Sequence, residues 1–155
     1  MRCSFVEPEP KPDPAVVPTP HETGLTSTIL LVDDEREVLT TLEAVLVSRG
    51  YRVATAINGA DALDKAARLR PAAVITDLLM PILDGIGLAK ALRSNPATAA
   101  TKIVLCSGVV EGSVRVLFTR YDAFLQKPFD SDALFKTLAA LLPLPSAETA
   151  RALGS

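Results

Sequence analysis

The sequence is poor in the residues that build most metal and disulfide sites. Its 155 residues include two cysteines, Cys3 and Cys106, and one histidine, His21. Cys3 and His21 lie in a polar N-terminal stretch, so we predict no disulfide framework, zinc site or histidine-based catalytic dyad. The low cysteine content favours a reducing, cytoplasmic setting.

Long apolar runs and an excess of positive charge are also missing. No apolar run approaches the roughly 18 residues needed to span a membrane, and residues 1–7 lack the apolar core of a signal peptide. The formal net charge is −2, and aromatic residues make up 5% of the chain. Because nucleic-acid binding depends on clustered Lys and Arg, we expect neither a nucleic acid nor a membrane as a partner.

Proline marks the ends of the folded part of the chain. Half of the 12 prolines lie in residues 1–27, at Pro8, Pro10, Pro12, Pro14, Pro18 and Pro20. We predict a disordered tail or linker over 1–27, one domain over 28–142 and a flexible C-terminal tail over 143–155, which begins at Pro143.

Within 28–142, short apolar runs alternate with segments of helical periodicity. We predict strands at 28–32, 52–57, 73–76, 102–106 and 123–126, and helices near 38–50, 59–70, 86–94, 113–120 and 131–142. The fourth helix is expected to be short or mobile, because residues 109–112 contain no obvious helix start. This order predicts an α/β fold, a doubly wound five-stranded parallel sheet with helices on both faces.

Polar side chains follow the predicted strands at their carboxyl ends. Asp33 and Asp34 follow the first strand, Asp77 the third, Ser107 the fourth and Lys127 the fifth. Because these ends of parallel strands lie along one edge, we expect the five side chains to converge. Each also has an ordinary explanation, as a capping acid, a turn residue or a surface lysine, and only their joint occurrence indicates a site.

Three clustered carboxylates call for a cation. Two unit charges 4 Å apart repel by roughly 4 kcal/mol at an effective dielectric constant of about 20, so such a cluster raises its pKa values or binds a cation. All-oxygen ligands favour Mg²⁺. A bound Mg²⁺ and the Lys127 ammonium would neutralise phosphoryl oxygens, Ser107 could donate a hydrogen bond to them, and Asp77 is left as the nucleophile.

The segment from about Thr28 to Leu142 resembles a response-regulator receiver domain of two-component signalling. The resemblance is carried by Leu31-Val32-Asp33-Asp34-Glu35, Thr76-Asp77-Leu78-Leu79-Met80-Pro81 with Asp84-Gly85, Leu105-Cys106-Ser107-Gly108 and Phe124-Leu125-Gln126-Lys127-Pro128-Phe129. It is most similar to the receivers of hybrid histidine kinases and to single-domain response regulators. The resemblance implies a flavodoxin-like sheet with strand order 2-1-3-4-5.

The resemblance also implies a role for each acid. Asp77 is the implied phosphoacceptor, which takes a phosphoryl group in line from the phosphohistidine of a histidine kinase or histidine phosphotransfer protein and later loses it by slow hydrolysis. Asp34, Asp77 and the Leu79 backbone carbonyl are the implied direct ligands of Mg²⁺, with Asp33 acting mainly through water.

The remaining motifs imply groups that sense the phosphoryl group. By resemblance, Ser107 hydrogen-bonds it, Lys127 pairs with it through a chain that continues by a cis peptide to Pro128, and Phe124 occupies the aromatic switch position. Two departures stand out: the 107–127 segment is about two residues shorter than in many members, and Phe124 replaces the commoner Tyr.

The predicted output is a protein contact. No DNA-binding or enzymatic domain is expected after Leu142, so we expect a downstream protein target at the face of the fourth helix, fifth strand and fifth helix, with Arg115, Phe118 and Phe124 as candidates. The chain is expected to act on no separate substrate and to assist only its own phosphorylation and dephosphorylation.

Two alternatives belong to other functional classes. A Mg²⁺-dependent phosphohydrolase of haloacid-dehalogenase type also uses an Asp nucleophile, but it would have Asp-x-Asp directly after the first strand, which Asp33-Asp34-Glu35-Arg36 does not offer. An interaction module that works without phosphorylation is the other. Turnover of free phosphoesters would favour the first, and failure to bind Mg²⁺ the second.

Overall fold

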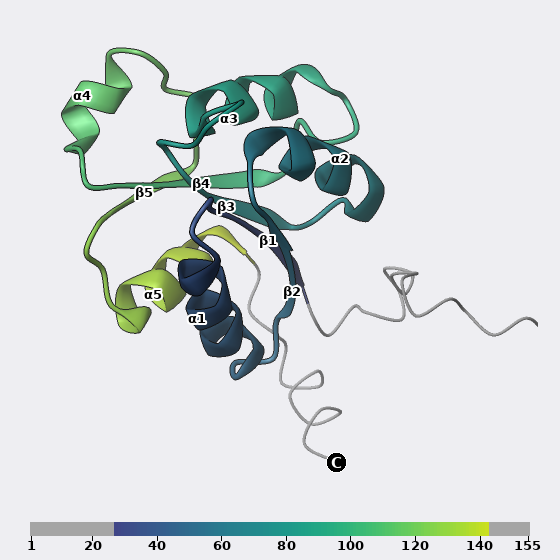
Figure 1. The fold of residues 1–155 in the computed structure, drawn as a ribbon, viewed down its shortest axis with the longest axis vertical. Helices are drawn as coiled ribbons and strands as arrows, with labels where there is room; N and C mark the ends of the chain where they lie inside the picture. The colour runs from purple at the N-terminus through teal and green to yellow at the C-terminus, as the bar shows by residue number, and fades with distance from the viewer. Residues whose placement is uncertain (1–26, 143–155) are drawn as a thin grey trace, which may run out of the picture.

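Five strands and five helices alternate along the chain in the computed structural model, which describes residues 27–142 (Figure 1). They are β1 (Thr28–Val32), α1 (Arg36–Val47), β2 (Arg52–Ala56), α2 (Gly59–Leu69), β3 (Ala73–Asp77), α3 (Gly85–Ser94), β4 (Lys102–Ser107), α4 (Glu111–Arg115), β5 (Ala123–Gln126) and α5 (Ser131–Leu141). The predicted tails, 1–26 and 143–155, lie outside the described residues.

The five strands form one parallel sheet in the order β2-β1-β3-β4-β5. The predicted fold class and strand order are therefore confirmed. The strands are continuous apolar runs because both faces of the sheet are covered, and Ile29, Leu30, Val74, Ile103 and Val104 have no exposed surface.

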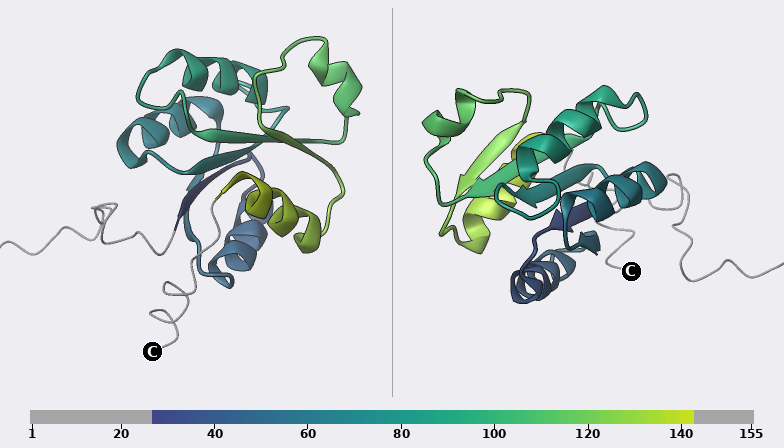
Figure 2. Two further views of the ribbon diagram at one scale, coloured as in Figure 1. Left: turned by 180° about the vertical axis from the view of Figure 1, so that it is seen from behind. Right: turned by 45° about the horizontal axis from the view of Figure 1, so that its top comes forward.

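Helices cover the two faces of the sheet in two groups, α1 with α5 and α2 with α3 and α4 (Figures 1 and 2). Leu46 of α1 and Leu138 of α5 are fully buried in one core, and Ala66 of α2 and Leu92 of α3 in the other. Burying each leucine contributes roughly 1.5–3 kcal/mol. Among the described residues, no helix combines the length and apolar character that a membrane span requires.

Side-chain caps anchor three of the helices at their N-termini. Asn58 accepts a hydrogen bond from the Asp61 amide at 2.8 Å, and Asp84 accepts one from the Gly87 amide at 2.7 Å. Asp130 caps α5 by accepting a hydrogen bond from the Ala133 amide at 2.8 Å. These caps satisfy amides that have no partner within the helix.

The fourth helix is short, as predicted, but its predicted bounds were wrong. It covers Glu111–Arg115 instead of about 113–120, and its N-cap residue, Val110, forms no side-chain cap. The amides of Leu117 and Phe118 both bind the Val114 carbonyl, at 2.8 and 3.0 Å, and this tight turn ends the helix. Phe118 then enters the core with 8% exposure, while Leu117 stays 67% exposed.

Candidate functional site

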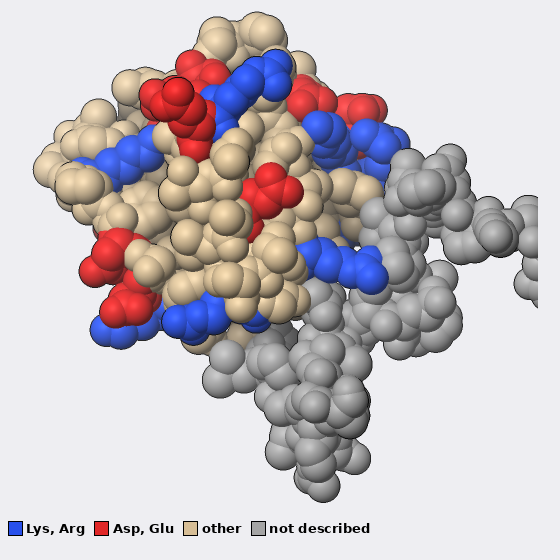
Figure 3. Space-filling model, turned by 60° about the horizontal axis from the view of Figure 1, so that its bottom comes forward, with Lys and Arg blue, Asp and Glu red and all other residues tan. Residues whose placement is uncertain are grey.

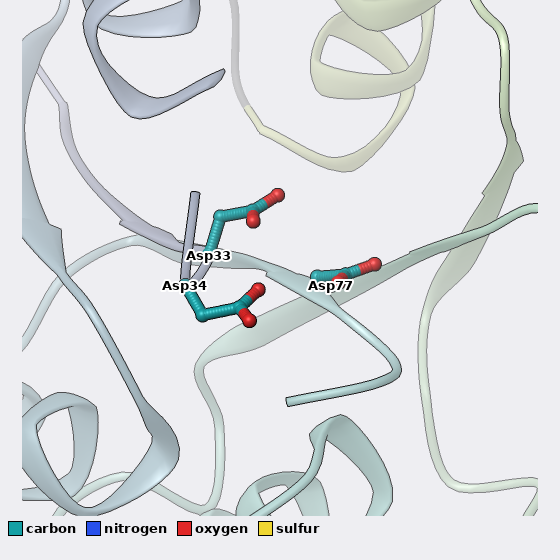
Figure 4. Close-up of side chains that lie close together, drawn as sticks. All are labelled: Asp33, Asp34 and Asp77. Atoms are coloured by element: carbon teal, nitrogen blue, oxygen red, sulfur yellow. The ribbon is translucent and has the colours of Figure 1, made fainter. Parts of the chain in front are cut away.

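Three acidic side chains meet where β1 and β3 end, as the sequence predicts (Figure 4). Asp33 and Asp34 directly follow β1, and Asp77 is the last residue of β3 rather than the residue after it. One carboxylate oxygen from each lies within 4.8 Å of the others. They converge because β1 and β3 are parallel neighbours whose carboxyl ends share one edge of the sheet.

The three acids differ in their surroundings. Asp33 is buried at 4% exposure and accepts a hydrogen bond from the Glu35 amide at 2.9 Å. Asp34 is exposed, and Asp77 is half-buried at the end of β3. The cluster therefore has one fixed, buried carboxylate and two that solvent or a ligand can reach.

Lys127 supplies the positive charge of the cluster. Its Nζ lies 3.1 Å from Asp77 Oδ1 and 3.5 Å from Asp33 Oδ2. Its backbone amide donates to the Ser107 carbonyl at 2.8 Å, which fixes the end of β5 against β4. The Lys127–Pro128 peptide bond is cis, as predicted.

Burial and charge shift the pKa values of this pair. Burial raises the pKa of the Asp77 carboxyl, as does the charge of Asp33, and these effects outweigh the opposing hydrogen bond and charge of Lys127. Burial by itself lowers the pKa of Lys127. The hydrogen bond to Asp77 and the charges of Asp77 and Asp33 raise this pKa by more than burial lowers it, so Lys127 remains protonated. The arrangement places a carboxylate with raised basicity beside a protonated lysine.

Ser107 and Phe124 lie on the neighbouring strands. Ser107 is 2% exposed at the end of β4, and its Oγ accepts a hydrogen bond from the Val109 amide at 3.0 Å. Because the hydroxyl acts as acceptor in that bond, its proton remains available for donation. Phe124, in β5, is half-buried, and its ring centroid lies 6.3 Å from that of Tyr121.

The loop after β3 packs tightly against the backbone of Asp77 and Leu78. A Cβ at Gly85 would lie 2.5 Å from the Asp77 carbonyl oxygen and 2.9 Å from Leu78 Cα, so only glycine fits there. The Gly85 amide donates to the Leu78 carbonyl at 2.8 Å, and Leu79 is 67% exposed. The sequence indicates a turn at Asp84-Gly85, but no local signal predicts this contact with the site.

A cavity of about 610 Å³ lies beside the acids, between α1 and the connection from β5 to α5. Its walls include Val38, Leu39, Leu42 and Phe129, and Asp77 lies at its edge. Figure 3 shows the side of the molecule that carries α1 and α5, where charges of both signs are interspersed with uncharged surface. Sequence reasoning missed this cavity, because it depends on how two distant segments pack.

Known proteins match the part of the chain that forms this fold. The family model described as "Response regulator receiver domain" matches residues 29–139. The transcriptional regulatory protein PrrA of Mycobacterium bovis is 38% identical over 122 residues, which cover 78% of this chain and 52% of PrrA. The response regulator MprA of a Mycobacterium species (strain KMS) is 38% identical over 114 residues, 74% of this chain and 50% of MprA. The chain thus spans about half the length of these relatives.

Two solved structures show the same fold. The chemotaxis protein CheY4 of Vibrio cholerae has a TM-score of 0.70 and 30% identity, over 76% of this chain and 99% of that one. The receiver domain of the sensor histidine kinase PA1611 of Pseudomonas aeruginosa PAO1, which holds a magnesium ion in its active site cleft, has a TM-score of 0.69 and 29% identity over 75% and 97%. The chain therefore belongs to the response-regulator receiver domain family of two-component signalling.

Proposed function

We propose that this domain accepts a phosphoryl group on Asp77 from the phosphohistidine of a histidine kinase or histidine phosphotransfer protein, and that this changes a protein-binding surface. The observation that supports it most is the placement of Lys127 Nζ, 3.1 Å from Asp77 Oδ1, within a cluster of three acids. A carboxylate with raised basicity beside a fixed cation suits nucleophilic attack on a phosphorus atom.

In the proposed reaction, an Asp77 carboxylate oxygen forms a bond to phosphorus while the bond between phosphorus and the donor imidazole nitrogen breaks. The imidazole keeps the electron pair of that bond and is then protonated from solvent. Lys127 holds a phosphoryl oxygen, and the proton of the Ser107 hydroxyl turns to another. Water later attacks the acyl phosphate, which releases inorganic phosphate and regenerates the Asp77 carboxylate.

The acid cluster fits a Mg²⁺ ion. Its carboxylates are hard oxygen ligands within 4.8 Å of one another, and no described Cys or His joins them. We assign Asp34, Asp77 and the Leu79 carbonyl as the direct ligands, with Asp33 acting through water. When bound, Mg²⁺ offsets the negative charge of the carboxylates and of the phosphoryl oxygens.

Partners and setting are part of the proposal. The expected output face combines α4, β5 and α5, where Val116 and Leu117 are 84% and 67% exposed. On this account the domain acts on no separate substrate, is cytoplasmic and uses no nucleic acid or membrane as a partner. PrrA is a transcriptional regulatory protein, and the activity of such a longer protein is not assigned to this chain.

Intact-mass spectrometry after incubation with Mg²⁺ and acetyl phosphate tests the acceptor. We expect a gain of about 80 Da in the wild type, loss of this gain on acid or base treatment, and no gain in Asp77→Asn. Asp132→Asn is the matched control, because Asp132 is an exposed acid in the first turn of α5. An equal gain in wild type and Asp77→Asn, or none in either, would overturn the assignment.

A further inference from the structure

Tyr121 ties the segment before β5 to α4. Its hydroxyl donates to Glu111 Oε1 at 2.8 Å, and Glu111 is the first residue of α4. The same carboxylate also pairs with Arg115 one helical turn later, at 3.2 Å. Tyr121 was not singled out by its sequence, because its contact depends on where α4 begins.

Few other contacts hold α4 in place. The helix has five residues and no side-chain cap at its N-terminus, and isolated helices of this length are unstable in water. Within it only Val114 is buried, while Val116 directly after it is 84% exposed. A hydrogen bond from a phenol to a carboxylate is therefore a large share of what fixes the helix.

The Tyr121–Glu111 bond is linked to the phosphorylation site from two directions. The Tyr121 ring lies between those of Phe118 and Phe124, with centroids 6.4 and 6.3 Å away. On the other side, the Ser107 hydroxyl holds the Val109 amide, two residues before Glu111. Any turn of Ser107 towards a phosphoryl group weakens this second restraint on the start of α4.

We propose that Tyr121 is the positioning residue of the switch: its hydroxyl holds Glu111, and so α4, in the unphosphorylated arrangement, and phosphorylation releases it. Only the release of α4 on phosphorylation rests on the proposed function; the tether itself does not. Phe124 has no hydroxyl of its own, so Tyr121 is the aromatic residue in this row that can bind α4. When the bond is absent, a larger fraction of molecules has α4 released before any phosphoryl group arrives.

Hydrogen exchange measured by mass spectrometry tests the tether. In unphosphorylated Tyr121→Phe we expect peptides covering 109–118 to exchange about three- to tenfold faster than in the wild type, the range for losing one such hydrogen bond at a half-exposed position. Glu111→Gln keeps an acceptor oxygen and should give a smaller rise. Tyr51→Phe is the control, because Tyr51 is the other of the two tyrosines and packs in the opposite core.

The rate of phosphorylation by acetyl phosphate tests the coupling. If release of α4 favours the reactive state, Tyr121→Phe should be phosphorylated faster than the wild type, by up to about tenfold. Phosphorylation should also change the exchange of residues 109–118 less in this variant than in the wild type. If Tyr121 acts only on local stability, the phosphorylation rate and the change in exchange on phosphorylation will both equal those of the wild type, and that result would overturn the coupling. Unchanged 109–118 exchange in unphosphorylated Tyr121→Phe, or an equal rise across the whole domain, would overturn the tether.

The two proposals fail differently. If the wild type gains no mass from acetyl phosphate, the phosphoacceptor assignment and the coupling both fall, while exchange in the unphosphorylated protein still decides whether Tyr121 holds α4. If mass is gained on Asp77 but the Tyr121→Phe rate is unchanged, only the coupling is wrong.

Discussion

Lys127→Met isolates the electrostatic balance of the site in the absence of metal. The ammonium lies 3.1 Å from Asp77 and 3.5 Å from Asp33, and each attraction amounts to about 5 kcal/mol at an effective dielectric constant of 20. Methionine keeps most of the volume and removes the charge. The variant then leaves Asp33, with its side chain 6% exposed, and Asp77, with 14%, repelling each other without a counter-charge.

The expected net loss is much smaller than these Coulomb energies. Taking Lys127 out of water opposes the attraction, and its side chain keeps 31% of its exposure. Breaking a fully buried pair costs about 3–5 kcal/mol and an exposed one about 0–1, so we expect about 2 kcal/mol. For a domain of this size that lowers the melting temperature by about 8 °C.

The assay is thermal and urea unfolding in EDTA, with Lys136→Met as control, because Lys136 is exposed on α5 and forms no ion pair with another described residue. The loss should shrink as the pH falls, because the pKa of Asp77 is already raised and rises further once Lys127 no longer lowers it. Mg²⁺ should stabilise the variant more than the wild type, because loss of the Lys127 charge leaves a more negative site that binds the cation more tightly. A 100-fold excess of Mg²⁺ over its Kd contributes about 2.7 kcal/mol. A variant as stable as the wild type in EDTA at neutral pH would refute the reasoning.

Three further predictions concern other parts of the domain. Arg93→Met should lose about 3 kcal/mol in urea unfolding, because the Arg93 side chain, 11% exposed, pairs with Asp122 at 2.6 Å and also donates to three backbone carbonyls; a loss under 1 kcal/mol would contradict this. Asp34→Ala should raise stability in EDTA by only about 0.5 kcal/mol, because Asp34 is exposed, and should weaken Mg²⁺ binding; a lower melting temperature in EDTA would show the repulsion argument to be wrong. Burial, followed by the hydrogen bond and charge of Glu111, raises the pKa of Tyr121 above its ordinary value of 10.0. The stability from this bond is therefore present below pH 10 and lost as the pH rises through the raised pKa. Tyrosinate absorbance in Tyr51→Phe should show the raised pKa of Tyr121, and the further change Glu111→Gln should lower it.

The sheet and the convergence of the site were predictable because both follow from short-range patterns. A run such as Thr28–Val32 is buried on both faces, and so predicts a parallel strand wherever it occurs. Once all strands are parallel, Asp33, Asp77 and Lys127 must lie along one edge whatever the helices do. The contact of Lys127 with two acids is a direct consequence of this topology.

The features that the sequence did not predict depend on packing between segments with no shared periodicity. The start of α4 carries no capping signal, so the sequence predicts a start two residues later than the observed one and gives no sign of the Tyr121–Glu111 bond. Gly85 is required by a backbone approach to Asp77, which a turn motif alone does not indicate. In both cases the deciding contact joins residues whose spacing along the chain carries no pattern.

The net charge of the site accounts for the role that we propose for Ser107. The three acids and Lys127 leave the metal-free site with two net negative charges, and a bound Mg²⁺ brings it to neutrality. Converting the Asp77 carboxylate to an acyl phosphate dianion restores one negative charge, which calls for another donor. Ser107 lies at the end of the adjacent strand, and its oxygen now holds the Val109 amide. If the Ser107 hydroxyl turns to donate its proton to the phosphoryl group, its oxygen moves relative to the Val109 amide. That movement weakens one of the two links between the site and α4, the other being the aromatic row that contains Tyr121.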